Sequence, residues 1–241
     1  MTLHLIQLCP DVPRLVRWAT AQGVLPREGE DDLGYALHAL LAAAFDTLAP
    51  RPFVLLRDGR RPATLLAYST ADATALREQA TAFALPETIA ALGLETLAGK
   101  AMPARFAAGR RLGFSLRVRP MIRADRDGDR AKAREVDAFL SAVTGTGPDA
   151  GPSRAEVYQD WLLRRLEEGG ATGETLTLTA FRLAAVYRRD QARKLRRSLG
   201  PDASFTGSLV VRDPENFAAL LTRGVGRHRA FGFGMLLLRP A

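Results

Sequence analysis

The pattern of apolar and polar residues predicts that the first half of the chain alternates between strands and helices. Short apolar runs bounded by turn residues indicate strands, and longer stretches with apolar residues every three or four positions indicate helices. The expected strands are 2–8 and the two halves of a hairpin within 52–69 that turns at Asp58-Gly59, and the expected helices are 11–20, 31–48 and 72–83. Residues 86–108 indicate only a short strand and a loop. The order in this half is β-α-β-β-α.

The second half begins with a cleanly alternating strand at residues 110–122. One face of this strand carries the apolar side chains Leu112, Phe114, Leu116 and Val118. The residues that follow predict a charged loop with a helical turn at 123–137, a loop at 144–152, a helix at 153–168, a strand at 174–187, a basic loop at 188–203, a strand at 204–213, a short helix from 213 and a final strand at 235–240. This half therefore has the order β-α-β-β-α-β and repeats the pattern of the first.

Two repeats of one element order in a chain of 241 residues predict a two-domain protein of the α+β class. The expected architecture is two tandem ferredoxin-like domains, each a βαββαβ unit of the RRM-like kind. The expected boundaries are 1–105 for the N-terminal domain and 109–241 for the C-terminal domain. Helix caps support these units, because N-cap residues precede four of the expected helices. The expected caps are Asp31 or Asp32, Asp72, Ser153 in a capping box with Glu156, and Asp213 before a proline.

Charge indicates a polyanionic partner for this fold. The net charge is +8 and the sequence pI is about 10.5, and most of the cations are arginines, which suit bidentate contacts with phosphate. Residues 100–134 hold eleven basic and three acidic residues, and residues 188–197 hold six and one. Such a surface favours nucleic acid first and an anionic membrane second. The alternative is a solvated basic face that contacts nothing.

Other features of the sequence indicate the cellular compartment and exclude some kinds of site and partner. The single cysteine, Cys9, leaves no intrachain disulfide framework and no CxxC metal site, which fits a reducing compartment. The N-terminal residues do not resemble a secretory signal, and no apolar run approaches the ~20 residues that span a membrane. We therefore expect a cytoplasmic protein with no membrane partner.

Candidate chemistry lies in the expected helix at 31–48, where Tyr35 and His38 interrupt a run of leucine and alanine. At about 100° per residue, the core-facing stripe consists of Leu33, Leu37, Leu40, Ala44 and Leu48. Both rings project away from this stripe toward one flank, since residues three apart are neighbours on a helix surface. Histidine suits proton transfer near neutral pH, and a tyrosine hydroxyl can bind a phosphate oxygen. HxxE and HExxH metal patterns are absent, so the pair favours metal-free acid–base chemistry, with an inert surface pair as the alternative.

The C-terminal residues 223–240 combine glycines with cations. The glycines are Gly224, Gly226, Gly232 and Gly234, and the cationic residues between them are Arg223, Arg227, His228 and Arg229. Glycine lets backbone N–H groups approach phosphate closely, so this segment is a candidate contact with an RNA or DNA backbone. It is neither a Walker loop nor a Rossmann fingerprint, because no Gly-Lys-Ser/Thr follows and the next element is a strand. We therefore expect no nucleotide cofactor. A tight turn with a β-bulge is the alternative.

Three segments together resemble a known family. Residues 33–45 resemble the Tyr-x-x-His helix, residues 109–120 the basic strand, and residues 223–240 the glycine-rich loop of CRISPR repeat-RNA endoribonucleases of type I-E systems, the CasE subunits of Cascade. The resemblance spans nearly the whole chain. One departure is that no lysine follows His38 on its helix, where Ala42, Ala43 and Ala44 stand instead. The cation that assists the cleaved phosphate is therefore left open.

The resemblance implies metal-independent cleavage of CRISPR repeat stem-loops in precursor RNA, without a cofactor. It implies attack by the ribose 2′-OH, with His38 as general base or acid and Tyr35 holding the 2′-OH or a phosphate oxygen. The products would be a 2′,3′-cyclic phosphate and a 5′-OH, and the mature guide RNA would stay bound and join other Cascade subunits. A non-catalytic hairpin-RNA-binding protein of the same fold, or a basic structural protein of a ribonucleoprotein, are the alternatives.

The expected RNA contacts come from the basic strand, the basic segment at 188–197 and the glycine-rich segment. They are Arg117, Arg119, Arg188, Arg189, Arg193, Lys194, Arg196, Arg197, Arg223, Gly224, Gly226, Arg227, His228, Arg229, Gly232 and Gly234. No metal-binding residue is expected.

Overall fold

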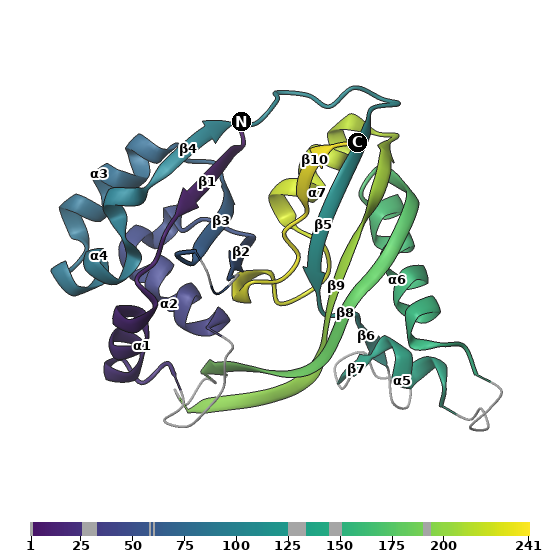
Figure 1. Ribbon diagram of the computed structural model, residues 1–241, viewed down its shortest axis with the longest axis horizontal. Helices are drawn as coiled ribbons and strands as arrows, with labels where there is room; N and C mark the ends of the chain where they lie inside the picture. The colour runs from purple at the N-terminus through teal and green to yellow at the C-terminus, as the bar shows by residue number, and fades with distance from the viewer. Residues whose placement is uncertain are drawn as a thin grey trace.

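In the computed structural model the chain forms two lobes, each built on its own four-stranded antiparallel sheet (Figure 1). The structure describes residues 2–25, 33–57, 59, 61–124, 134–144, 151–189 and 194–241. Within this part of the chain no helix is long and apolar enough to cross a membrane. The expected α+β class with two ferredoxin-like units is confirmed, because both sheets have the strand order of that fold.

The N-terminal lobe places its sheet strands in the order β2-β3-β1-β4. The strands are β1 (His4–Leu8), β2 (Phe53–Leu56), β3 (Thr64–Ser69) and β4 (Ala98–Ala101), and the helices are α1 (Val12–Ala21), α2 (Gly34–Phe45), α3 (Ala73–Phe83) and α4 (Pro86–Leu92). The helices bury their apolar stripes against the sheet, and the core between them includes Ile6, Leu37 and Leu76. The expected β2–β3 hairpin is confirmed, although Asp58 lies outside the described residues.

The C-terminal lobe repeats this arrangement with the order β10-β5-β9-β8. Its strands are β5 (Arg111–Val118), β8 (Ala171–Arg189), β9 (Leu195–Val211) and β10 (Leu237–Pro240), and its main helices are α6 (Arg154–Glu168) and α7 (Pro214–Arg223). A small ribbon of β6 (Met121–Ala124) and β7 (Arg134–Asp137), followed by α5 (Ala138–Ala142), is inserted between β5 and α6. The core includes Phe114, Leu162 and Phe217.

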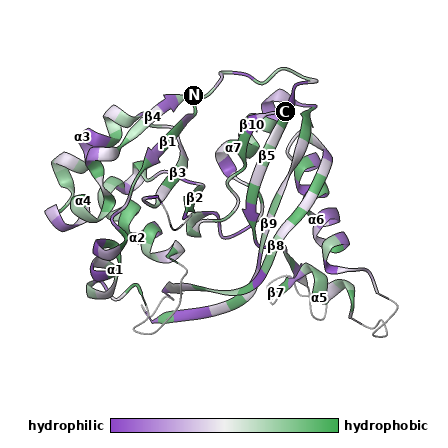
Figure 2. Ribbon diagram, in the orientation of Figure 1, coloured by the Kyte–Doolittle hydropathy of each residue, from purple (hydrophilic) through white to green (hydrophobic). Residues whose placement is uncertain are grey.

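The hairpin expected around the basic loop at 188–203 is longer than expected, because strand pairing continues through much of that loop. β8 continues to Arg189 and β9 begins at Leu195, so that residues 183–189 pair in register with residues 195–201. We call these two paired segments the arm. Continued pairing satisfies backbone N–H and C=O groups that a loop would leave to solvent. The arm leaves its own lobe and passes beneath the N-terminal lobe (Figure 1), and hydrophilic residues concentrate toward its end (Figure 2).

Two other segments also differ from expectation. α4 occupies residues expected to be loop, because Pro86 fits a first helical turn and Gly93, with a φ of 67°, ends the helix. The expected loop with a helical turn at 123–137 contains the β6–β7 ribbon, in which Ile122 pairs with Val136. Residues 125–133 and 145–150 lie outside the described residues.

Three of the four expected helix caps are confirmed. Asp72 accepts a hydrogen bond from the N–H of Ala75, Asp213 caps α7, and Ser153 forms a reciprocal capping box with its glutamate. Asp31 and Asp32 lie outside the described residues. The N-cap position of α2 is Leu33, which makes no side-chain cap, so packing rather than a cap holds this helix start.

A buried contact between β3 and the residue that precedes β10 joins the lobes. The Tyr68 hydroxyl on β3 donates a hydrogen bond to the carbonyl of Leu236 at 2.9 Å. The same tyrosine ring packs in the C-terminal core with Phe114 and Met235. Burial raises the pKa of Tyr68 to a value far above its ordinary range, so the hydroxyl remains a donor. This contact fixes the position of the N-terminal helices relative to the C-terminal loops.

Candidate active site

α2 carries the candidate acid–base pair. Four residues of the expected core stripe are buried, namely Leu33, Leu37, Leu40 and Ala44. Tyr35 and His38 are only partly buried, as expected for side chains that leave the stripe. Leu48 differs from expectation: α2 ends at Phe45, and Leu48 lies 37% exposed in the short 3-10 helix that follows.

Phe231, which the sequence analysis did not single out, joins α2 to the glycine-rich loop (residues 223–234). Its ring centroid lies 5.3 Å from that of His38 in edge-to-face contact and 5.7 Å from that of Tyr35. The ring of His228 lies 6.1 Å from the same phenylalanine, and the rings of Tyr35 and His38 are 6.2 Å apart. The fold thus brings the two sequence motifs, from opposite ends of the chain, into one aromatic cluster.

His38 is held in its neutral form. Burial lowers its pKa below the ordinary value, and the positive charge of Arg51 lowers it further. A histidine with a lowered pKa is neutral at physiological pH, so its imidazole can accept a proton. The site can therefore perform general-base chemistry.

Tyr35 is tied to the arm. Its hydroxyl accepts a hydrogen bond from the backbone N–H of Arg189 at 3.2 Å. The Arg189 guanidinium in turn donates to the carbonyls of Gln22 at 2.6 Å and Gly23 at 3.2 Å. Arg189, expected to contact RNA, is therefore used to dock the arm on the N-terminal lobe, close to the candidate base.

Glu135 on β7 is a site residue that the sequence pattern did not reveal. It accepts hydrogen bonds from Arg227 Nη1 and, at 3.1 Å, from His228 Nε2 when that nitrogen carries a proton. Burial alone would raise the pKa of Glu135, but the hydrogen bonds and charges of His228 and Arg227 lower it. A carboxylate thus anchors the middle of the glycine-rich loop, from a strand more than ninety residues away in sequence.

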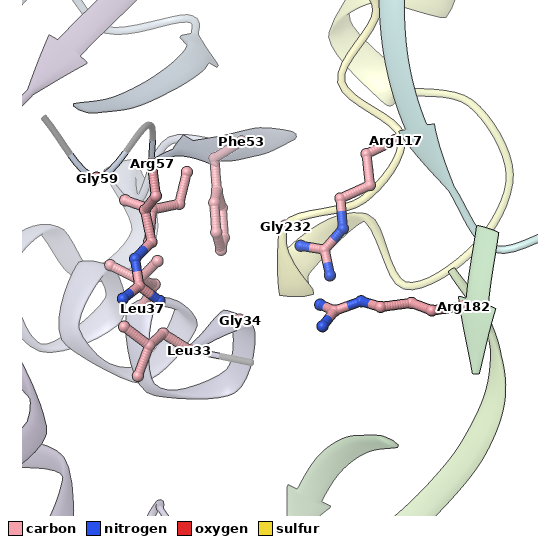
Figure 3. Close-up of a pocket in the computed structure, with 10 residues that line it drawn as sticks. Leu33, Gly34, Leu37, Phe53, Arg57, Gly59, Arg117, Arg182 and Gly232 are labelled. Carbon is pink, nitrogen blue, oxygen red and sulfur yellow. The ribbon is translucent and has the colours of Figure 1, made fainter. Parts of the chain in front are cut away.

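The junction of the lobes holds a basic cavity of about 500 Å³ (Figure 3). Arg57 lines it from the N-terminal lobe, while Arg117 and Arg182 project from the C-terminal lobe. Both of these arginines bind Asp202 at 2.8 Å. Burial alone would raise the pKa of Asp202, but the two arginines lower it. Asp202 offsets only part of the charge of the three arginines, so the cavity keeps a net positive lining.

A second cavity, of about 810 Å³, is lined by Phe231. Among the described residues, its lining includes Arg51, Arg223, Arg227, Arg229, His228 and one carboxylate, Glu135. Burial, followed by the charges of neighbouring arginines, lowers the pKa of Arg229. This concentration of cations suits the phosphates of a nucleic acid.

The arm contributes further expected cations. Arg196 and Arg197 are exposed on it, as is Lys194 immediately before its second segment, and Arg196 lies opposite Arg188 in the strand pairing. Arg193 and the side chain of Arg188 lie outside what the structure describes. Arg119 differs from expectation: its side chain is 1% exposed, stacked 5.6 Å from the Phe233 ring. Arg119 therefore belongs to the protein interior and offers no surface for RNA.

The four glycines of the loop are needed by the fold itself. Gly224, Gly226, Gly232 and Gly234 all have positive φ, a conformation that costs other residues steric strain. A Cβ at Gly234 would lie 2.4 Å from the Val225 carbonyl oxygen, and one at Gly226 would lie 2.8 Å from the Trp161 ring. The tight-turn interpretation thus accounts for these two, while Gly232 lines the 500 Å³ cavity.

No group of three or more histidine, cysteine, aspartate or glutamate side chains placed to hold a metal ion occurs among the described residues.

Comparison with known proteins bears on this arrangement. The CRISPR-associated endoribonuclease Cse3 of Thermus thermophilus is 32% identical over 139 residues, which are 55% of this chain and 57% of that protein, so the match spans less than two thirds of the relative. The structure of Thermus thermophilus Cse3 bound to an RNA representing a pre-cleavage complex has a TM-score of 0.61 at 21% identity, with both chains fully covered. A chain of a CRISPR RNA-guided surveillance complex has a TM-score of 0.55 at 15% identity, covering 99% of this chain and 100% of that one. These two structures share the fold described above.

The sequence model of one family accounts for almost the entire chain, from the first strand of the N-terminal sheet to the last strand of the C-terminal sheet. It matches residues 3–240 and therefore includes α2, the arm and the glycine-rich loop. The protein belongs to the family of CRISPR-associated proteins.

Proposed function

We propose that the protein is an endoribonuclease that cleaves CRISPR repeat hairpins in precursor RNA to give mature guide RNA. The observation that carries this proposal is the packing of His38 and Tyr35 against Phe231 of the glycine-rich loop, beside two cavities lined with arginine. A neutral histidine next to cations can support RNA transesterification, because it can accept the proton of the 2′-OH while the cations stabilise the charge on the phosphate. The similarity to an RNA-bound Cse3 structure supports RNA as the substrate.

The proposed reaction needs no metal ion. His38 removes the proton of the ribose 2′-OH, the 2′-oxygen attacks the adjacent phosphorus, and the bond to the 5′-oxygen breaks. The products are a 2′,3′-cyclic phosphate and a 5′-OH, the latter completed by a proton from solvent. Tyr35 orients the 2′-OH or a phosphate oxygen through its hydroxyl. DNA lacks the 2′-OH, so it binds the same surface without being cut.

The product is proposed to remain on the enzyme. The arm and the two cavities provide a basic surface that does not depend on the scissile bond, so cleavage alone does not remove the contacts that hold the stem. The retained guide RNA then carries the protein into a Cascade complex with other subunits, in keeping with the fold it shares with a surveillance-complex chain.

The decisive experiment is incubation with a repeat hairpin RNA in excess EDTA, followed by analysis of the product ends. We expect one cut, a 2′,3′-cyclic phosphate and a 5′-OH, and no cut in the all-DNA hairpin. Tight hairpin binding without cleavage would instead favour a non-catalytic RNA-binding protein of the same fold. Binding that ignores the hairpin would favour a structural protein of a ribonucleoprotein.

Tyr35→Phe tests the proposed role of the hydroxyl. The ring contact with Phe231 remains, whereas the hydrogen bond from the Arg189 N–H is removed. We expect the single-turnover cleavage rate to fall about 5- to 20-fold, consistent with the removal of one hydrogen bond in the transition state. A rate equal to that of the wild type would remove the Tyr35 hydroxyl from the mechanism.

Glu135→Gln tests the anchor of the glycine-rich loop. The substitution keeps the size of the side chain but removes the charge that holds Arg227 and His228. We expect cleavage to slow about 3- to 10-fold because Phe231 is less firmly placed, while RNA affinity stays equal or rises, since an anion leaves a phosphate-binding surface. Glu174→Gln, which removes a surface pair with Arg111, is the control. Rate and affinity falling together would contradict this role.

A further inference from the structure

Attack of a 2′-OH on phosphorus places additional negative charge on the non-bridging oxygens, and a positioned cation stabilises that charge. α2 supplies no such cation, because residues 39–45 are all apolar. The Tyr35 hydroxyl, for its part, accepts a hydrogen bond from the backbone N–H of Arg189 rather than from its guanidinium. The cation must therefore come from another element that reaches His38.

Most arginines at the junction of the lobes are already bound within the protein. The pairs are Arg227 with Glu135, Arg117 and Arg182 with Asp202, and Arg189 with the carbonyls of Gln22 and Gly23. Each of these guanidinium groups would have to give up a charge-assisted or carbonyl hydrogen bond before it could bind phosphate. We therefore assign these arginines to holding the loop, the arm and the cavity walls in place rather than to stabilising the charge on the scissile phosphate.

Arg51, immediately before β2, is different. Its side chain is exposed, and no carboxylate in the described parts of the chain forms an ion pair with it. Its backbone, in contrast, is fixed, because the Arg51 N–H donates to the Tyr68 carbonyl at 2.9 Å and the Pro52 carbonyl accepts from the Tyr68 N–H at 3.0 Å. A cation with an available charge thus stands on a rigid base beside the contact that joins the lobes.

Arg51 also shares a cavity with the ring that contacts the candidate base. It lines the 810 Å³ cavity together with Phe231, the ring in edge contact with His38 at 5.3 Å. Electrostatics agree with this placement: after burial, the Arg51 charge is the next cause of the lowered pKa of His38. Arg229 lines the same cavity, but its Nη1 donates to the Arg223 carbonyl at 2.8 Å and so braces the loop.

We propose that Arg51 is a catalytic residue that binds a non-bridging oxygen of the scissile phosphate and neutralises the charge developing there. This inference rests on the proposed function and assigns the cation that the helix of His38 lacks. As the proton of the 2′-OH moves to His38 and the bond from phosphorus to the 5′-oxygen breaks, Arg51 neither gains nor loses a proton. A guanidinium stays charged throughout the physiological range, so its contribution does not vary with pH.

The test compares Arg51→Ala and Arg51→Lys with the wild type in single-turnover cleavage of the repeat hairpin in EDTA, from about pH 5 to pH 8. Affinity is measured separately with RNA carrying a 2′-deoxy nucleotide at the cut site. We expect the alanine variant to cleave about 10- to 100-fold more slowly with affinity changed less than about threefold. Lysine should restore part of the rate, since it keeps the charge but not the planar fork.

The pH dependence of the cleavage rate separates an effect of charge from a structural role, because a purely structural role of Arg51 would not shift its midpoint. Removing a positive charge near His38 favours the imidazolium, so the midpoint of the profile should rise in Arg51→Ala. Arg105→Ala, an exposed arginine in the connection between the lobes, is the control and should match the wild type. Cleavage by Arg51→Ala within twofold of the wild type, or a fall in rate fully matched by a fall in affinity, would overturn the inference. A wild-type protein that binds the hairpin without cutting it would overturn the proposed function instead.

Discussion

His38→Ala is expected to lower the single-turnover cleavage rate by about 10²- to 10⁴-fold, the range that general acid–base catalysis contributes. The affinity for the uncut hairpin should change only a few-fold, because the arginines proposed to bind phosphate lie on other elements. The effect follows from the position of the imidazole: it is partly buried, in contact with Phe231, and neutral. Cleavage by the variant at the wild-type rate in EDTA would show that His38 is not the base.

His228→Ala is the matched control, since the His228 ring lies 6.1 Å from the same phenylalanine ring. Its imidazole is engaged with Glu135, so we expect the loop to be less firmly positioned and the rate to fall only several-fold. If His228→Ala abolished cleavage and His38→Ala did not, the two roles would be reversed. The far-UV circular dichroism and melting temperature of each variant separate these effects from misfolding.

The pH dependence of the wild type follows from the same histidine. Its pKa is lowered by burial and then by Arg51, so the base becomes active below the ordinary value of 6.5. The cleavage rate should rise with pH through that lowered pKa and reach a plateau before neutrality. A midpoint above the ordinary value would contradict the assignment of His38 as a buried, neutral base.

The second large effect is expected from the arm. Replacing Lys194, Arg196 and Arg197 together by alanine should weaken hairpin binding about 10- to 100-fold at low salt, since each cation that contacts phosphate releases counterions from the RNA. The slope of log K against log salt should flatten by about 0.7–0.9 for each phosphate that the variant no longer neutralises. The sequence alone predicted a loop here. The paired strands found instead give the cations defined positions, which makes the expected loss of affinity more specific. The strand pairing sets the positions of Arg196 and Arg197, from which we expect them to contact the A-form phosphates of a stem.

The control is a triple variant with the same change of charge at the opposite end of the molecule. Lys100, Arg105 and Arg110 are exposed on β4 and on the connection that follows it, far from the arm in Figure 1. Their replacement by alanine should leave the affinity and the salt slope close to those of the wild type. Equal losses of affinity in both triple variants would indicate that only net charge matters, and an unchanged affinity in the arm variant would indicate a solvated face.

Local sequence determined a large part of this fold. Alternation identified β5, helical spacing identified α2 and α6, and capping residues placed the starts of α3, α6 and α7. These signals succeed because each depends on residues within a few positions of one another. They fail where the energy comes from distant partners. α4 is held by contacts with α1 and α2, and the arm is held by cross-strand pairing and by the bond from Arg189 to Tyr35.

The same distinction applies to the candidate site. The sequence by itself determined that Tyr35 and His38 leave the apolar stripe of one helix, and that cations and glycines cluster near the C-terminus. Only the tertiary structure decided that these motifs meet, because the buried contact of Tyr68 with Leu236 holds one lobe against the other. It also decided which residues complete the cluster. Phe231, Glu135 and Arg51 carry no local signal, since their roles come from contacts across the junction of two lobes rather than from spacing along one element.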